Sequence, residues 1–185
     1  MPSVSKIPQN INKYAIKCAH EIKNKEVEFA KGINFEHGKI TSKSELVEGL
    51  RSTVSYDFAQ SPKDVFVHNH PIFTNTIKEL SHDDIATALK NGVQKIIAAT
   101  KYGFTAIDFS TASKKISKEQ MYEWIRLRQA LFQVKKMELG ENKLLGDLAP
   151  KMLEKIHYQT LKDFAKYSGA TFSDVKWADY KKVKR

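Results

Sequence analysis

Residues 65–71 have the sequence Val-Phe-Val-His-Asn-His-Pro, an apolar run that ends in a pair of histidines. The run predicts a central β-strand, and residues two apart on a strand point to the same face of the sheet. His68 and His70 would then present two imidazoles that can bind one metal ion. Asp84, from the next element, can add a carboxylate oxygen. Two nitrogens and one oxygen suit zinc with its fourth position left to water, as a catalytic zinc requires.

Residues 81–84 have the sequence Ser-His-Asp-Asp, which admits a second interpretation. Ser81 followed three residues later by Asp84 is also a capping box, in which the serine caps a helix and the aspartate lies in the first turn. The two interpretations are compatible because a carboxylate has two oxygens. His82 and Asp83 lie off the metal pattern and are predicted to be surface residues, with Asp83 as an alternative ligand.

The order His-x-His-Pro, a spacer and then Ser-x-x-Asp resembles the metal signature of the JAMM/MPN (JAB-like) zinc metalloproteases. The motif at 68–71 is especially similar to the RadC-type members and to related phage- and toxin-associated domains. Residues 84–89 and 92–100 are similar to the same branch, so the resemblance covers residues 26–109. It implies a curved mixed sheet between helices, a cytidine-deaminase-like core, and a hydrolase (peptidase or isopeptidase) that uses Zn²⁺ and a metal-activated water.

The resemblance also implies roles for two further side chains. Glu28 corresponds to the glutamate that acts as general base ahead of the histidine pair, and Glu26, on the same face, is the alternative. Ser81 corresponds to the residue whose hydroxyl stabilises the oxyanion. The spacer between His70 and Asp84 is three residues longer than is usual in the family, which places an insertion in the loop 72–80, beside the metal.

Helical and strand patterns alternate along the first 110 residues, which predicts an α/β fold with a mixed sheet flanked by helices. Apolar spacing of three and four predicts helices, and alternation predicts strands. The predicted helices are 9–24, 44–50, 82–91, 118–139 and 150–168, and the predicted strands are 26–35, 53–58, 64–69, 93–100 and 104–109.

The net charge of +10 is unevenly distributed. Residues 1–110 hold 14 Lys/Arg against 12 Asp/Glu, a balance of +2, whereas residues 111–185 hold 17 against 9, a balance of +8. We therefore predict a metalloprotease-like domain at 1–110 and a basic α-helical extension at 111–185. The charge of the extension favours an anionic partner, and the alternative function is a nucleic-acid-associated phage or mobile-element protein, a nuclease or a binding factor.

The single cysteine, Cys18, rules out an internal disulfide and fits a reducing compartment. The first residues contain no apolar stretch of the signal-peptide type, and no run reaches the length of a membrane span. These features predict a cytoplasmic protein with no membrane partner. The expected partner is a peptide or protein substrate, with a ubiquitin-like conjugate as one form of it.

Overall fold

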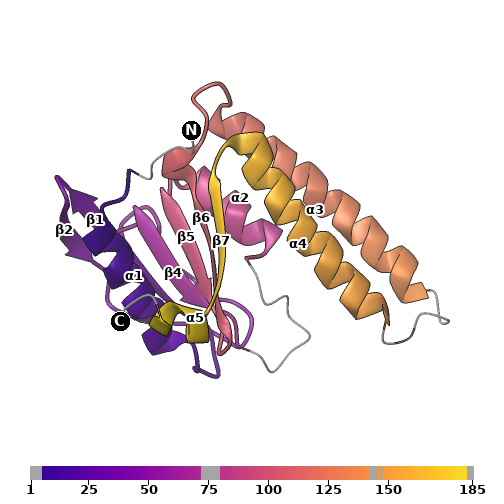
Figure 1. The fold of residues 1–185 in the computed structure, drawn as a ribbon, viewed down its shortest axis with the longest axis horizontal. Helices are drawn as coiled ribbons and strands as arrows, with labels where there is room; N and C mark the ends of the chain where they lie inside the picture. The colour runs from indigo at the N-terminus through magenta and orange to yellow at the C-terminus, as the bar shows by residue number, and fades with distance from the viewer. Residues whose placement is uncertain (1–5, 72–79, 142–145, 147, 183–185) are drawn as a thin grey trace.

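The computed structural model describes residues 6–71, 80–141, 146 and 148–182 (Figure 1). The loop predicted to carry the three-residue insertion falls mainly on residues 72–79, outside this described part. No helix among the described residues combines the length and the apolar character that a membrane crossing requires.

A mixed, open sheet of seven strands forms the middle of the molecule, which confirms the predicted α/β class. The strands follow the order β2-β1-β4-β5-β6-β7, and β3 pairs with β1. Only β4 and β5 run parallel; the other pairs are antiparallel. The strands are β1 (Phe29–Glu36), β2 (Lys39–Lys43), β3 (Val47–Glu48), β4 (Val65–Asn69), β5 (Lys95–Ala99), β6 (Gly103–Asp108) and β7 (Thr171–Lys176).

Helices cover both faces of this sheet (Figure 1). On one side α1 and α5 enclose a core with Val65, Val67 and Ile97, and on the other side α2, α3 and α4 enclose a core with Phe66 and Ile96. A strand covered on both faces is apolar at nearly every position, which explains the unbroken run of β4. The helices are α1 (Gln9–Ile22), α2 (His82–Lys90), α3 (Lys118–Glu141), α4 (Leu148–Ser168) and α5 (Trp177–Lys182), with a 3₁₀ turn η1 (Phe109–Thr111).

Two predicted elements are wrong. The predicted helix at 44–50 is extended and contains β3, because the Gly49 N–H donates to the Glu28 carbonyl at 2.8 Å and draws the segment alongside β1. The predicted strand at 53–58 makes no ladder in this fully described segment. Its alternating aromatic residues, Tyr56 and Phe58, instead pack on Phe66 of β4.

The predicted extension, residues 111–185, contains the helices α3 and α4 and also supplies β7. β7 pairs with β6 along its whole length. Ile125 of α3 and Phe164 of α4 are fully buried in the core beneath the sheet. The C-terminal part is therefore packed into the same sheet and the same core that hold the histidine strand.

Candidate metal centre

The strand register brings His68 and His70 to the face of the sheet that α2 covers. His68 lies between Ala30 of β1 and Ala98 of β5, two small neighbours that leave room for an imidazole ring. His70 follows the end of β4, and its N–H donates to the Ala99 carbonyl at 2.8 Å. The pair is thus held on a rigid strand end, as the i, i+2 spacing predicts.

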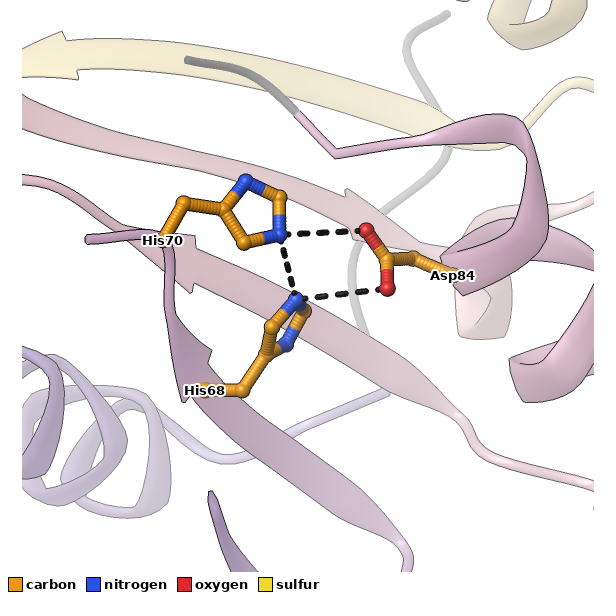
Figure 2. Close-up of side chains that lie close together, drawn as sticks. All are labelled: His68, His70 and Asp84. Carbon is orange, nitrogen blue, oxygen red and sulfur yellow. Dashed lines mark hydrogen bonds and ion pairs between the residues drawn. The ribbon is translucent and has the colours of Figure 1, made fainter. Parts of the chain in front are cut away.

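The two imidazoles and the Asp84 carboxylate point toward one another (Figure 2). The His68 and His70 Nε2 atoms are 3.0 Å apart. Asp84 Oδ1 lies 3.4 Å from His68 Nε2, and Oδ2 lies 3.3 Å from His70 Nε2. Both histidines are buried, while the Asp84 side chain keeps 23% of its surface exposed. These three side chains could hold a metal ion on the side of the cluster that remains accessible.

Asp84 serves the helix cap and the cluster at the same time. The Ser81 N–H donates to Asp84 Oδ2 at 2.7 Å, and the Asp84 N–H donates to Ser81 Oγ at 3.0 Å, so the predicted capping box is present. The cap orients the carboxylate toward the histidines. Burial by itself raises the pKa of Asp84, but His68 and His70 outweigh burial and hold that pKa well below its ordinary value.

Glu28 immediately precedes β1 and lines the same cavity as the histidines. Glu28 lies two residues before Ala30, which pairs with His68, so its side chain belongs to the same face as His68. Burial raises the pKa of Glu28, His68 and His70 lower it, and the net shift is upward. Glu26 is exposed and is not among the residues that line this cavity. Of the two glutamates that the sequence left as alternatives, the structure therefore has Glu28 in the cavity and Glu26 exposed outside it.

Asn69, between the two histidines, points to the opposite face and clamps the backbone around Glu28. Its Oδ1 accepts from the Phe29 N–H at 2.6 Å, and its Nδ2 donates to the Val27 carbonyl at 3.1 Å. The Glu28 N–H itself donates to the Leu50 carbonyl at 2.8 Å. The backbone that carries Glu28 is therefore fixed on both sides, and Asn69 makes the structural hydrogen bonds expected from its position on the strand.

A second pair of histidines, His82 and His157, packs next to the helix cap that carries Asp84. Sequence analysis did not predict this pair. His82, predicted to lie on the surface, is buried, and its ring packs edge-on against His157 of α4 at 4.6 Å between centroids. His157 Nε2–H donates to the Leu80 carbonyl at 2.8 Å, just ahead of the Ser81 cap. Two of the other ring nitrogens, His82 Nε2 and His157 Nδ1, have no hydrogen-bond partner among the described residues. Asp83, in contrast, is exposed and pairs with Arg126 at 3.1 Å.

The buried pair predicts a loss of stability in acid. Burial, followed by the proximity of His157, lowers the pKa of His82 from 6.5 to about 4, so the unfolded chain takes up this proton at a higher pH than the folded protein. The contribution of His82 to the free energy of unfolding is complete above pH 6.5 and is lost as the pH falls toward 4, by up to about 3 kcal/mol.

Urea unfolding of chelator-treated protein at a series of pH values measures this effect without a contribution from bound metal. His82→Phe, which keeps an aromatic ring against Phe132, should flatten the profile between pH 6.5 and 4. Parallel profiles for the wild type and His82→Phe would show that other groups control the acid limb.

A cavity of about 570 Å³ opens at the histidine cluster. The two histidines, Glu28, Ser81 and Asp84 form its polar end. Six apolar or aromatic residues also line it, Val54, Tyr56, Phe58, Phe66, Pro71 and Ile96. The remaining lining residues are polar or charged: Ser52, Thr53, Asp83, Thr87 and Lys136. A cavity that combines a few polar groups with an apolar lining has the form of a small-molecule or peptide site.

Comparison with known proteins finds no family model, no curated protein and no solved structure that matches this chain. The resemblance to the JAMM/MPN proteins therefore depends on the motif residues themselves and on where the fold places them.

Proposed function

We propose that this protein is a JAMM-like zinc metalloprotease or isopeptidase, similar in its motif to the RadC-type branch. One observation carries the proposal: the fold brings His68, His70 and Asp84 together and places Glu28 in the same cavity. These residues come from three separate elements, and the family resemblance assigns a role to each of them.

The spacing of the donor atoms supports a tetrahedral metal. Zinc bonds of about 2.0–2.1 Å to nitrogen and oxygen require neighbouring ligand atoms to lie about 3.3 Å apart at the edges of a tetrahedron. In the cluster the two histidine Nε2 atoms are 3.0 Å apart, and each lies 3.3 to 3.4 Å from a different oxygen of the Asp84 carboxylate, close to the length of a tetrahedral edge. Two imidazole nitrogens with one carboxylate oxygen are a donor set suited to zinc, with one position left open. His68, His70 and Asp84 would hold the ion.

The chemistry divides among the side chains of the site. When bound, zinc supplies a water of lowered pKa and polarises the scissile carbonyl. Glu28 accepts the proton of the attacking water at its carboxylate and passes it to the leaving amine. Ser81 uses its Oγ lone pair in the cap, which leaves its O–H free to donate to the developing oxyanion.

Cleavage of a peptide library by zinc-loaded protein tests this function directly. New amino termini identified by mass spectrometry would report peptide-bond hydrolysis, and ubiquitin-like conjugates of lysine would report isopeptidase activity. A chelator should abolish the cleavage and added zinc should restore it. Glu28→Gln protein from the same preparation controls for contaminating proteases, and equal cleavage by both proteins would reject the proposal.

A nucleic-acid-binding function is a second candidate, supported by a basic stripe on α4. Lys151, Lys155, Lys162 and Lys166 are all exposed, and their spacing of four, seven and four residues places them on one face of the helix. A row of cations along a helix suits a phosphate backbone, which dominates such binding.

Charge reversal of this stripe tests the second candidate. We expect Lys151→Glu with Lys155→Glu to weaken binding of DNA or RNA in a filter or anisotropy assay and to reduce its dependence on salt. Lys39→Glu with Lys43→Glu, on β2, is a matched control of equal charge on the opposite end of the sheet. Equal losses in both double variants would indicate a response to net charge alone.

A further inference from the structure

We propose that the cavity beside the histidine cluster selects substrates with a bulky apolar side chain next to the cleaved bond. The inference rests on the proposed function, because it concerns the substrate class of that same site. It is carried by an aromatic wall that lines this cavity.

Three aromatic rings make up this wall. Tyr56, Phe58 and Phe66 lie 4.8 to 4.9 Å from one another between ring centroids, each pair at a tilted or edge-on angle. Tyr56 and Phe58 are only half-buried although they pack together, and all three rings line the cavity. Val54 and Ile96 extend the apolar lining. Such a surface gains free energy when an apolar group covers it.

The wall continues directly into the histidine cluster. The Phe66 ring stacks on the His68 ring, with 5.6 Å between centroids and 25° between planes. His68 Nε2 faces His70 and Asp84. A group placed against the Phe66 ring therefore lies next to the His68 ring, which carries one of the candidate metal ligands. The apolar side chain would therefore belong to a residue adjoining the reacting carbonyl.

The wall is rigidly attached to the sheet. The Tyr56 hydroxyl donates to the Pro62 carbonyl at 2.5 Å, which closes the 56–62 segment, and the Lys63 N–H that follows it donates to Asn34 Oδ1 of β1 at 2.7 Å. Gly32 of β1 permits this approach, because a Cβ there would collide with both the Pro62 carbonyl oxygen and the Tyr56 hydroxyl. A preformed apolar surface costs little ordering free energy on binding and therefore discriminates well between side chains.

The size of the space agrees with such a ligand. A cavity of about 570 Å³ can take a phenyl or branched aliphatic side chain together with the flanking peptide units. A glycine at this position would leave the aromatic wall in contact with water. The geometry thus favours a large apolar residue beside the cleaved bond over the small residues of a glycine-rich tail.

Two hydroxamic acids provide a test that does not require a known substrate. Acetohydroxamic acid and 3-phenylpropanohydroxamic acid carry the same metal-binding group and differ in the apolar arm. Isothermal titration of zinc-loaded protein should show the phenyl compound binding at least about tenfold more tightly, the effect of burying one such side chain. Val54→Phe, which fills the cavity, should abolish that advantage, and the zinc content of the same sample shows whether the metal is still bound.

Val134→Phe is the matched control, because Val134 lies exposed on α3 outside the cavity. It should keep the full advantage of the phenyl compound. Equal affinities of the wild type for the two compounds would overturn the substrate class while leaving the metal site intact. Zinc-loaded protein that binds neither compound would also overturn the inference, whereas protein that takes up no zinc would refute the metal site itself.

Discussion

His70→Ala protein should lose nearly all of its zinc under conditions in which the wild type retains about one ion per chain. The expected loss of affinity exceeds 100-fold, because removing even the outer hydrogen-bonding partners of metal ligands typically costs about 10–100-fold. His68→Ala should behave in the same way because it removes a second imidazole, and Asp84→Asn should weaken zinc binding because it replaces the charged carboxylate with a neutral amide. Elemental analysis after dialysis against a fixed zinc buffer measures the content.

His37→Ala is the control for nonspecific loss of an imidazole, because His37 is exposed in the β1–β2 turn, far along the strand from the cluster. It should bind zinc as the wild type does. Circular dichroism of each variant shows whether the fold persists. A wild-type protein that stays free of zinc when zinc is offered would refute the metal site and the enzyme function together.

Glu28→Gln should separate catalysis from metal binding. Glutamine keeps the shape of the side chain and the backbone remains clamped by Asn69, so zinc content and stability should stay close to those of the wild type. The proton acceptor is lost, and loss of a positioned general base typically lowers the rate by about 10²–10⁴-fold. The measurements are kcat with a peptide or isopeptide substrate found in the library and zinc content on the same samples.

Glu26→Gln is the matched control, two residues away on an exposed position. It should retain normal activity. Normal cleavage by Glu28→Gln together with an inactive Glu26→Gln would assign the base to Glu26. Normal cleavage by both variants would exclude this general-base mechanism, whatever the metal content.

The local pattern of the sequence predicted the strand and helix that carry the cluster. The i, i+2 spacing of His68 and His70 already places both imidazoles on one face, and the Ser81 and Asp84 pair already specifies a helix start. Both features depend only on residues close together in the chain and on the regular geometry of strands and helices, so they can be predicted from the sequence. The α1, α2, α3 and α4 helices and the β4, β5 and β6 strands were predicted on the same basis.

Contacts between distant segments could not be read from those patterns. The presence of Glu28 in the cavity, and the exposed position of Glu26, depend on how the segment before β1 packs beside β4, which a spacing of two residues cannot reveal. The burial of His82 follows from the packing of α2 on Phe132 and His157, residues 50 and 75 positions further along the chain. Isolated histidines carry no periodic signal, so only the docking of the helices brings them together.

The sequence alone determined which residue types reach the candidate metal centre and that a mixed α/β sheet carries them, because periodicity and short-range spacing encode both. The tertiary structure alone decided what surrounds that centre. It turned the alternation of 53–58 into an aromatic cavity wall, since Gly32 lets that segment lie against β1 without forming a ladder. It also pairs β7, from the C-terminal part, with the edge of β6. The unpaired N–H and C=O groups of an edge strand can bond to any extended segment beside them, and the helices α3 and α4 bring β7 to that position.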